Sequence, residues 1–208
     1  MGLRERQKTG RTQRILDAAV VLFTEKGFDQ VKAEEIAEQA EVSVGTLYNY
    51  FGSKNEILLT LSALENEQIE ALAAAHKADL TATAADTLCS LLNVYFDPKN
   101  FMLDKTLWRL GYALSLIHVS SEAARRFRRS DIMLRQQVVD MSETLQRQGL
   151  LRMDLDCQTF GAALFNNASM IFFDFTRSEN KTYPDTRQEI DDMTRSLVSL
   201  AILPKSTS

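Results

Sequence analysis

Residues 36–51, IAEQAEVSVGTLYNYF, decide the fold. Apolar residues recur at helical spacing on both sides of a break at Glu41-Val42-Ser43, which predicts two short amphipathic helices joined by a turn. Ala37 and Ala40 are small enough for these helices to cross closely, and Ser43 stands at the N-cap position of the second helix. The pattern matches a helix-turn-helix, although an ordinary αα-hairpin within a helical bundle has the same spacing.

The second of these short helices is expected to have one buried side and one side facing solvent. Val42 and Leu47 are predicted to pack against Leu22 and Ile36. In a helix-turn-helix, the opposite side of the second helix meets base edges and phosphates. The residues that would populate this outer face are Ser43, Val44, Gly45, Thr46, Tyr48 and Asn49.

The flanking sequence has helical period throughout, which predicts an all-α protein. A first helix should end near Lys26, with Gly27 as its C-terminal stop, and Ser53 should cap a long helix that runs to about His76. The apolar stripe of the first helix consists of Ile15, Ala18, Ala19, Leu22 and Phe23. Further helices are predicted near residues 83–96, 102–118, 122–148, 156–177 and 186–202.

These elements predict two domains. Residues 1–52 would form a basic arm and a three-helix, helix-turn-helix domain. Residues 53–208 would form a larger helical bundle, with helix 53–76 connecting it to the first domain. Fifty-two residues bury little core on their own, so the connecting helix is expected to support the smaller domain.

Composition and charge restrict the class of protein. Of the 208 residues, 45% are hydrophobic, which excludes wholesale disorder, and eight Gly with three Pro are too few for turn-dense all-β folds. The net charge is −4, but residues 1–14 carry +4 and the remainder −8. This basic arm on an acidic body differs from a protein whose whole surface is suited to nucleic acid.

The sequence shows no signal for membrane insertion, disulfides or catalysis. No run of 18 apolar residues occurs, and Cys89 and Cys157 lie too far apart for a CxxC zinc or redox motif, so a cytoplasmic protein is predicted. The GxSxG, GxxxxGK and GxGxxG patterns are absent, and His118 has no partner at metal-binding spacing. Asp154 and Asp156 fit a turn followed by a helix cap better than an acid–base pair. We therefore predict no enzyme activity, metal or cofactor.

The N-terminal region resembles the DNA-binding region of TetR-family transcriptional regulators. The resemblance covers about 50 contiguous residues, while the rest of the chain matches mainly in helix count. It rests on Ile15–Ala19, Phe23, Gly27-Phe28, Ile36-Ala37, Ala40, Val42-Ser43, Gly45-Thr46-Leu47-Tyr48, Tyr50-Phe51 and Ser53-Lys54. It implies a homodimeric, ligand-responsive repressor that binds a palindromic operator in double-stranded DNA.

The resemblance also implies roles for individual residues. Lys54 is similar to a family lysine that grips a phosphate, and Tyr48 and Tyr50 occupy positions of DNA-backbone contacts. Val44, Gly45, Thr46 and Asn49 stand at base-facing positions. The basic arm could follow phosphates or enter a minor groove. The full predicted DNA-binding set is Arg4, Arg6, Lys8, Arg11, Lys32, Ser43, Val44, Gly45, Thr46, Tyr48, Asn49, Tyr50 and Lys54.

Two positions depart from the family pattern. Family members usually carry Thr or Ser where this chain has Val31 and Lys32, so the hydroxyl cap of the second helix is missing. Glu41 stands where Gly is common, and a residue with a side chain costs roughly 1 kcal/mol in a left-handed turn. Its negative charge would also be mildly repulsive near DNA.

Aromatic residues concentrate in the second region, where they form either plain core or an effector pocket for a small, partly apolar molecule. Arg109, His118, Asn166 and Asn167 lie within apolar helical stretches and are expected to be core or interface groups with polar partners, or else ligand contacts. The predicted effector-binding residues are Phe96, Trp108, Arg109, Tyr112, His118, Phe165, Asn166 and Met170. The predicted dimer-interface residues are Phe160, Leu164, Ile171, Met193, Leu197 and Leu200, because the last two helices are apolar on more than one side.

The sequence thus predicts a DNA-binding repressor that a small molecule releases from its operator. The alternative is a helical protein-interaction or structural dimer without sequence-specific DNA binding. The operator, the effector and the regulated genes cannot be read from the sequence.

Overall fold

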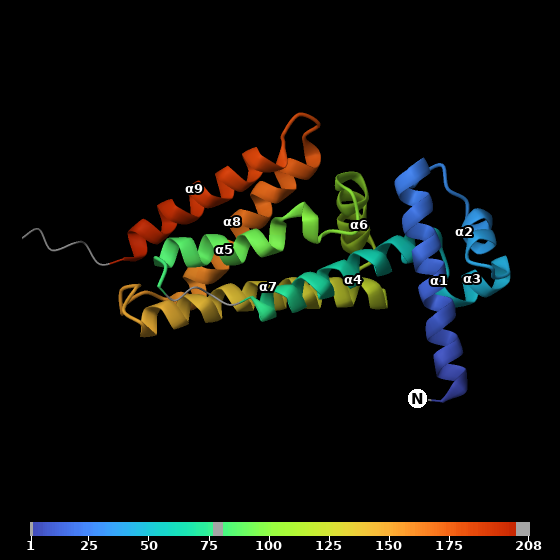
Figure 1. Cartoon of the computed structure of the whole chain (residues 1–208), viewed down its shortest axis with the longest axis horizontal. Helices are drawn as coiled ribbons and strands as arrows, with labels where there is room; N and C mark the ends of the chain where they lie inside the picture. Colours follow the sequence, from blue (N-terminus) through green and yellow to red (C-terminus); the bar gives the residue numbers. More distant parts are fainter. Residues whose placement is uncertain (1, 77–80, 203–208) are drawn as a thin grey trace, which may run out of the picture. The chain divides into compact units, whose positions relative to one another are not determined.

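The computed structural model describes residues 2–76 and 81–202, except for the side chains of Leu3 and Arg4. Within these residues the fold is all-α, as predicted, with nine α-helices, one short 3-10 helix and no strand (Figure 1). None of the described helices has the length and apolarity needed to cross a membrane. The elements are α1 (Leu3–Lys26), α2 (Ala33–Gln39), α3 (Val44–Phe51), α4 (Lys54–Ala75), α5 (Ala84–Phe96), η1 (Pro98–Asn100), α6 (Lys105–Ile117), α7 (Glu122–Arg147), α8 (Cys157–Arg177) and α9 (Tyr183–Ala201).

Helix boundaries follow local capping chemistry. Gly27 ends α1 with φ of 78°, a conformation that favours glycine, and its N–H donates to the carbonyl of Phe23. Asp156 begins α8 by accepting hydrogen bonds from the backbone N–H groups of Gln158 and Thr159, which confirms its predicted role as a cap. The main difference lies in α1, which continues to Leu3, twelve residues upstream of the apolar stripe that predicted it.

The described chain forms two compact units, each with its own core. Unit 1 comprises the residues up to Glu65 together with Met102–Arg128, and unit 2 comprises Asn66–Phe101 together with the residues from Arg129 onward. The division falls later than the predicted boundary at residues 52 and 53. The reason is that the first turns of α4, including Leu58, are buried in the same hydrophobic cluster as α1–α3. The predicted functional division into DNA-binding and effector domains stays a prediction.

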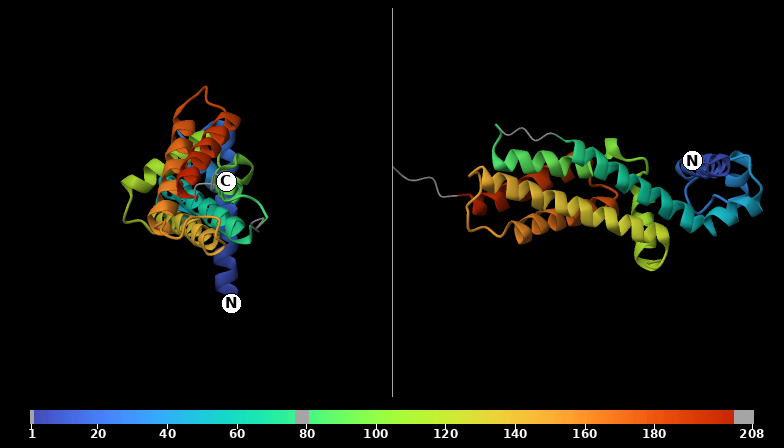
Figure 2. Two further views of the ribbon diagram at one scale, coloured as in Figure 1. Left: turned by 90° about the vertical axis from the view of Figure 1, so that its left-hand side faces the viewer. Right: turned by 90° about the horizontal axis from the view of Figure 1, so that it is seen from below.

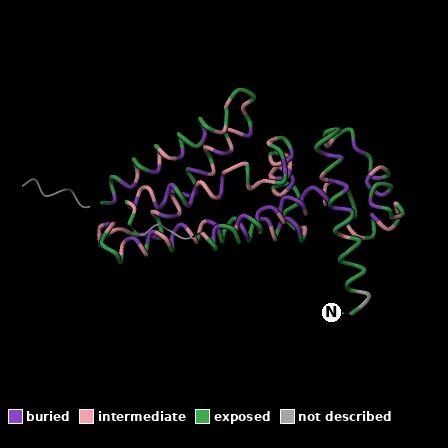
Figure 3. Tube along the Cα trace, viewed as in Figure 1, coloured by how far each residue is buried: buried purple, intermediate pink, exposed green. Residues whose placement is uncertain are grey.

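The core of unit 1 forms where α1, α2 and α3 meet the start of α4. Ile15, Phe23, Ile36 and Leu47 are each at most 1% exposed and belong to one hydrophobic cluster. In Figure 3 the buried colour is confined to the second half of α1, whereas its N-terminal turns are exposed. The apolar stripe therefore accounts for the packed half of α1 only.

Unit 2 is built around α9, which packs against both α5 and α8 (Figure 2). Its core contains ring-to-ring contacts, with Phe96 lying 6.3 Å from Phe165 and 5.3 Å from Phe172 between ring centroids. These rings are buried among one another, so this cluster is core. Gly161 lets α8 approach α7 closely, because a Cβ there would come within 2.7 Å of the Val139 backbone.

A buried carboxyl group fastens the start of α6 to α4 inside unit 1. Glu65 is fully buried, and its Oε1 accepts hydrogen bonds from the backbone N–H groups of Met102 (2.6 Å) and Leu103 (2.7 Å). Its Oε2 is buried without a hydrogen-bond partner. Burial raises the pKa of Glu65 to about 7, against the lowering effect of the two backbone hydrogen bonds.

This raised pKa predicts a pH-dependent stability. Because folded Glu65 holds its proton more tightly than the unfolded chain does, its contribution to the free energy of unfolding falls as the pH rises from about 4.5 to about 7 and is constant above that. Glu65→Gln should therefore remove part of the loss in melting temperature between pH 5 and pH 8. Thermal melts followed by circular dichroism measure this difference. Glu38→Gln, at an exposed site on α2, is the control and should behave as the wild type. Identical pH profiles for Glu65→Gln and wild type would contradict the assignment.

Candidate nucleic-acid interface

The turn between α2 and α3 has the predicted helix-turn-helix conformation. The N–H of Val42 donates to the carbonyl of Ala37 at 2.9 Å, which closes the end of α2. Ser43 then caps α3 by accepting from the N–H of Thr46, as predicted. Ala37 and Ala40 are buried where the two helices cross. The sequence therefore located this motif correctly.

One side of α3 is buried and the other is exposed, as the periodicity predicts. Leu47 and Phe51 are buried, whereas Tyr48 is 46% exposed. Of the six residues predicted on the outer face, Ser43, Gly45, Tyr48 and Asn49 are exposed and Val44 and Thr46 are half-buried. Tyr50, predicted to contact the DNA backbone, is half-buried against the core. This side of α3 offers hydroxyl, amide and aromatic groups, which are suited to base edges and phosphates.

The predicted basic arm is the helical start of α1. Arg6, Lys8 and Arg11 are exposed, and the side chain of Arg4 lies outside the part of the structure that is described. Lys8 and Arg11 stand seven and four residues before Ile15 and so share its side of the helix. Because Ile15 is buried in the core of unit 1, Lys8 and Arg11 lie on the side of α1 that faces this core further along the helix.

Glu41 occupies the left-handed conformation that the sequence predicted. Its φ is 53°, and it is the one non-glycine residue with positive φ among those described. Its carboxylate lies 3.4 Å from the guanidinium of Arg14 on α1, with both side chains largely exposed. Arg14 therefore partly neutralises the charge whose repulsion of DNA was expected. An exposed pair of this kind contributes about 0–1 kcal/mol.

The hydroxyl cap of α2 is missing, but the carboxylate of Glu35 binds the N–H of the N-cap residue itself. Lys32 is the N-cap residue and its side chain makes no capping hydrogen bond, but its N–H donates to Glu35 at 2.8 Å. Glu35 also binds Lys26, and this hydrogen bond is the main cause that lowers the pKa of Glu35. Lys32 itself is exposed. Its side chain is thus directed to solvent, where a phosphate could meet it.

Lys54 makes contacts that the sequence did not predict. Its ammonium donates to the carbonyls of Phe28 (2.7 Å) and Val31 (2.8 Å) and lies 3.5 Å from that of Asp29. It also lies 4.3 Å from the centroid of the Phe28 ring. Phe28 and Lys54 both belong to the motifs that resemble the TetR family. Nothing in the sequence showed that their side chains meet.

The predicted effector-binding residues do not form one site within either unit. Trp108, Arg109, Tyr112 and His118 lie in unit 1, and Phe96, Phe165, Asn166 and Met170 lie in unit 2. The polar members are not core groups, because Arg109, His118, Asn166 and the neighbouring Asn167 are all exposed, and their place in an interface stays a prediction. His118 follows the last residue of α6, where the helical pattern no longer directs side chains inward. Whether the aromatic residues contact an effector stays a prediction.

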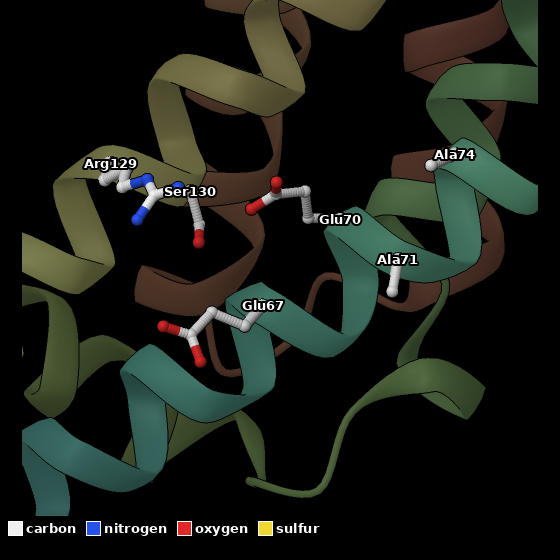
Figure 4. Close-up of a pocket in the computed structure, with 6 residues that line it drawn as sticks. All are labelled: Glu67, Glu70, Ala71, Ala74, Arg129 and Ser130. Carbon is white, nitrogen blue, oxygen red and sulfur yellow. The ribbon is translucent and has the colours of Figure 1, made fainter.

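A pocket of about 270 Å³ lies between α4 and α7 within unit 2 (Figure 4). Glu70 projects from α4 toward α7, where Arg129 and Ser130 lie, and small alanines leave the space open. Its lining comprises Glu67, Glu70, Ala71, Ala74, Arg129 and Ser130, none of which was predicted to bind an effector. Charged and apolar groups both line it, and it lies apart from the aromatic residues that the sequence suggested for an effector. In the described residues, no group of three or more His, Cys, Asp and Glu could hold a metal ion.

The residues predicted at the dimer interface differ in how far they are exposed. Leu164 is fully buried inside unit 2, so its assignment to an interface is wrong: it faces the core side of α8. Leu200 is 73% exposed, and Met170, predicted instead for the effector site, is 58% exposed. Phe160, Ile171, Met193 and Leu197 are half-buried. Exposed apolar side chains on α8 and α9 are the kind of surface that a partner covers.

The first three helices and the start of α4 match a known family. Residues 15–61 fit the family model described as bacterial regulatory proteins, tetR family. Residues 15–61 are thus similar to the N-terminal domain of the TetR family. An HTH-type transcriptional repressor KstR from Mycolicibacterium smegmatis is 40% identical over 83 residues, covering 40% of this chain and 38% of that protein. A fatty acid metabolism regulator protein from Bacillus subtilis is 43% identical over 56 residues, covering 27% of this chain and 29% of that protein.

The match to these curated relatives spans less than two fifths of their length. The likeness in fold to solved structures nevertheless extends over nearly the whole chain. The structure of Thermus thermophilus FadR, a TetR-family repressor in complex with lauroyl-CoA, superimposes with a TM-score of 0.60 at 21% identity, covering 95% of this chain and 98% of that one. Bacillus subtilis FadR in complex with stearoyl-CoA gives a TM-score of 0.61 at 20% identity, covering 90% of this chain and 96% of that one. The matched relatives are named as regulators, not as enzymes.

Glu41 offers a test of the turn geometry. Glu41→Gly relieves the left-handed strain, whereas Glu41→Ala keeps it, and both variants lose the ion pair with Arg14. We expect the glycine variant to exceed the alanine variant by about 1 kcal/mol in free energy of unfolding. Urea denaturation measures both values. Equal stabilities would show that the turn carries no strain at this residue.

Proposed function

We propose that this protein is a homodimeric transcriptional repressor that binds a palindromic site in double-stranded DNA and is released by a small molecule. The observation that carries the proposal is the exposed side of α3, with Gly45, Tyr48 and Asn49, presented by a TetR-family helix-turn-helix. The exposed basic turns of α1 supply the electrostatic attraction to phosphate that such a reader needs. The relatives named as repressors support repression as the mode of action.

Two copies are needed to read a palindrome, because each α3 reads one half-site. The exposed side chains of Met170 on α8 and Leu200 on α9 support an interface formed by these two helices. In this proposal the edge of the interface is formed by four half-buried residues, Phe160, Ile171, Met193 and Leu197.

Release requires an effector that binds one arrangement of the dimer better than the other. Helices α4 and α7 each contribute residues to both units, so a change in one unit has a continuous helical path to the other. We propose a partly apolar effector. Because two similar folds are described in complex with acyl-CoA thioesters, lauroyl-CoA and stearoyl-CoA are the first compounds to test.

Selection of bound duplexes from a random DNA pool tests the proposal. A palindromic winner is expected, and its affinity should fall by about a thousandfold or more between 50 and 200 mM salt if six or more phosphates are contacted. Added lauroyl-CoA or stearoyl-CoA then shows whether such ligands release the DNA. If neither the protein alone nor the protein with these ligands enriches any sequence, the interaction-protein alternative would be favoured.

The basic face of α1 gives a second prediction. Replacing Arg6, Lys8 and Arg11 together by Ala should weaken DNA binding and reduce the slope of log affinity against log salt by about 0.9 for each phosphate that the variant no longer neutralises. Fluorescence anisotropy at several salt concentrations measures this slope. Arg187→Ala, at an exposed residue on α9, is the control and should leave it unchanged. An unaltered slope in the triple variant would show that the N-terminal turns of α1 do not contact the DNA phosphates.

The dimer surface gives a third prediction. Met170→Glu combined with Leu200→Glu should place two charges on the proposed interface in each copy and shift the protein to monomer, with loss of binding to the palindrome. Light scattering and anisotropy measure the two effects. Met153→Glu, at a residue 74% exposed outside α8 and α9, is the matched control. A double variant that stays dimeric would place the interface elsewhere.

A further inference from the structure

The pocket between α4 and α7 has walls of opposite charge. Glu67 and Glu70, about one helical turn apart on α4, belong to one wall, and Arg129 and Ser130 on α7 belong to the other (Figure 4). All four residues lie in unit 2. The lining therefore offers carboxylate oxygens to a positive group on one side and guanidinium N–H groups to a negative group on the other.

The opposite charges of Glu70 and Arg129 are not paired inside the protein. The carboxylate of Glu70 points from α4 toward Ser130 and Arg129 in Figure 4. In the part of the chain that the structure describes, however, no ion pair includes either Glu70 or Arg129. A carboxylate and a guanidinium that line one pocket without pairing are both available to a ligand placed between them.

The two helices that carry these groups are joined next to the pocket. The side-chain amide of Gln137 on α7 donates to the backbone carbonyl of Glu70 at 3.2 Å, and its Oε1 accepts from the hydroxyl of Tyr95 on α5 at 3.1 Å. Ile69 on α4 and Leu134 on α7 are buried in the same unit. The backbone of both walls is thus fixed before a ligand binds, which lowers the cost of ordering the site.

The volume of the pocket limits the ligand to a small molecule. It measures about 270 Å³, roughly nine times the share of one water molecule in the liquid and just below the range usual for drug-sized ligands. Ala71 and Ala74 add short apolar surfaces to the lining.

The charges of the walls limit the ligand further. An anion bound by Arg129 would be repelled by Glu70, and a cation bound by Glu70 would be repelled by Arg129. A small molecule that carries both charges is attracted by both walls.

We propose that this pocket binds a small zwitterion, with its carboxylate on Arg129, its ammonium on Glu70 and its short carbon chain against Ala71 and Ala74. Ser130 supplies a hydroxyl that can donate or accept a hydrogen bond. This site goes beyond the proposed function, because its ligand differs from the partly apolar effector. Its test uses no DNA, so either proposal can fail without the other.

Aliphatic amino acids of increasing length test the site, because the distance between their two charges differs. The probes are glycine, β-alanine, γ-aminobutyrate, ε-aminocaproate and L-leucine, titrated against the protein and followed by nuclear magnetic resonance. We expect at least one of them to bind with a Kd of about 1 mM or below. The amine and the carboxylic acid of the same carbon chain each lack one charge and should bind at least about tenfold more weakly. If no probe binds, or if a singly charged analogue binds as tightly as the zwitterion, the proposal is overturned.

Two variants assign the ends of the ligand. In Glu70→Gln the zwitterion should lose at least about tenfold in affinity and bind no better than its carboxylic acid analogue, and in Arg129→Gln no better than its amine analogue. Arg128→Gln, at an exposed residue beside Arg129 that does not line the pocket, is the control and should leave affinity unchanged. Damage to the structure would instead weaken the zwitterion and both analogues alike. That result, or an unchanged affinity in Glu70→Gln or Arg129→Gln, would refute the assigned contacts.

Discussion

The burial of Leu47 and Phe51 is the constraint on which the exposed surface of α3 depends. Both side chains enter the cluster that contains Phe23 and Ile36, and a helix of eight residues has little freedom to rotate once two of its side chains are fixed. Tyr48 and Asn49, which follow Leu47 in sequence, are consequently turned to solvent. The same packing that stabilises the three helices thus presents the groups proposed to read DNA.

Polar groups control the positions of the segments around this core. Lys54 binds carbonyls of the loop before α2, and Glu35 accepts a hydrogen bond from the N–H of Lys32, the N-cap residue of α2. Glu65 binds two N–H groups at the start of the segment that leads into α6. In each case an ionisable side chain satisfies backbone groups near a helix terminus, where the helix itself leaves them unpaired or where a loop has no regular partner.

Several residues that looked like binding groups in the sequence have structural or surface positions. Phe96 and Phe165 pack ring against ring in unit 2, and His118 lies beyond the end of α6. Glu65 shows the opposite case. It stands seven residues after Leu58 and four before Ile69, at a buried register of α4, so a charged residue on an apolar stripe was the signal that could have singled it out.

The sequence alone was sufficient for the all-α class, the helix-turn-helix and most helix boundaries, because periodicity, Ser43, Gly27 and Asp156 act over one or two turns of chain. The left-handed conformation of Glu41 was indicated by the resemblance to the TetR family, in which Gly is common at this position. Only the tertiary structure decided that Lys54 meets the loop near Phe28 and that Leu164 is buried. Those outcomes depend on contacts between distant segments, and helical period fixes the sides of a helix without specifying what covers each side.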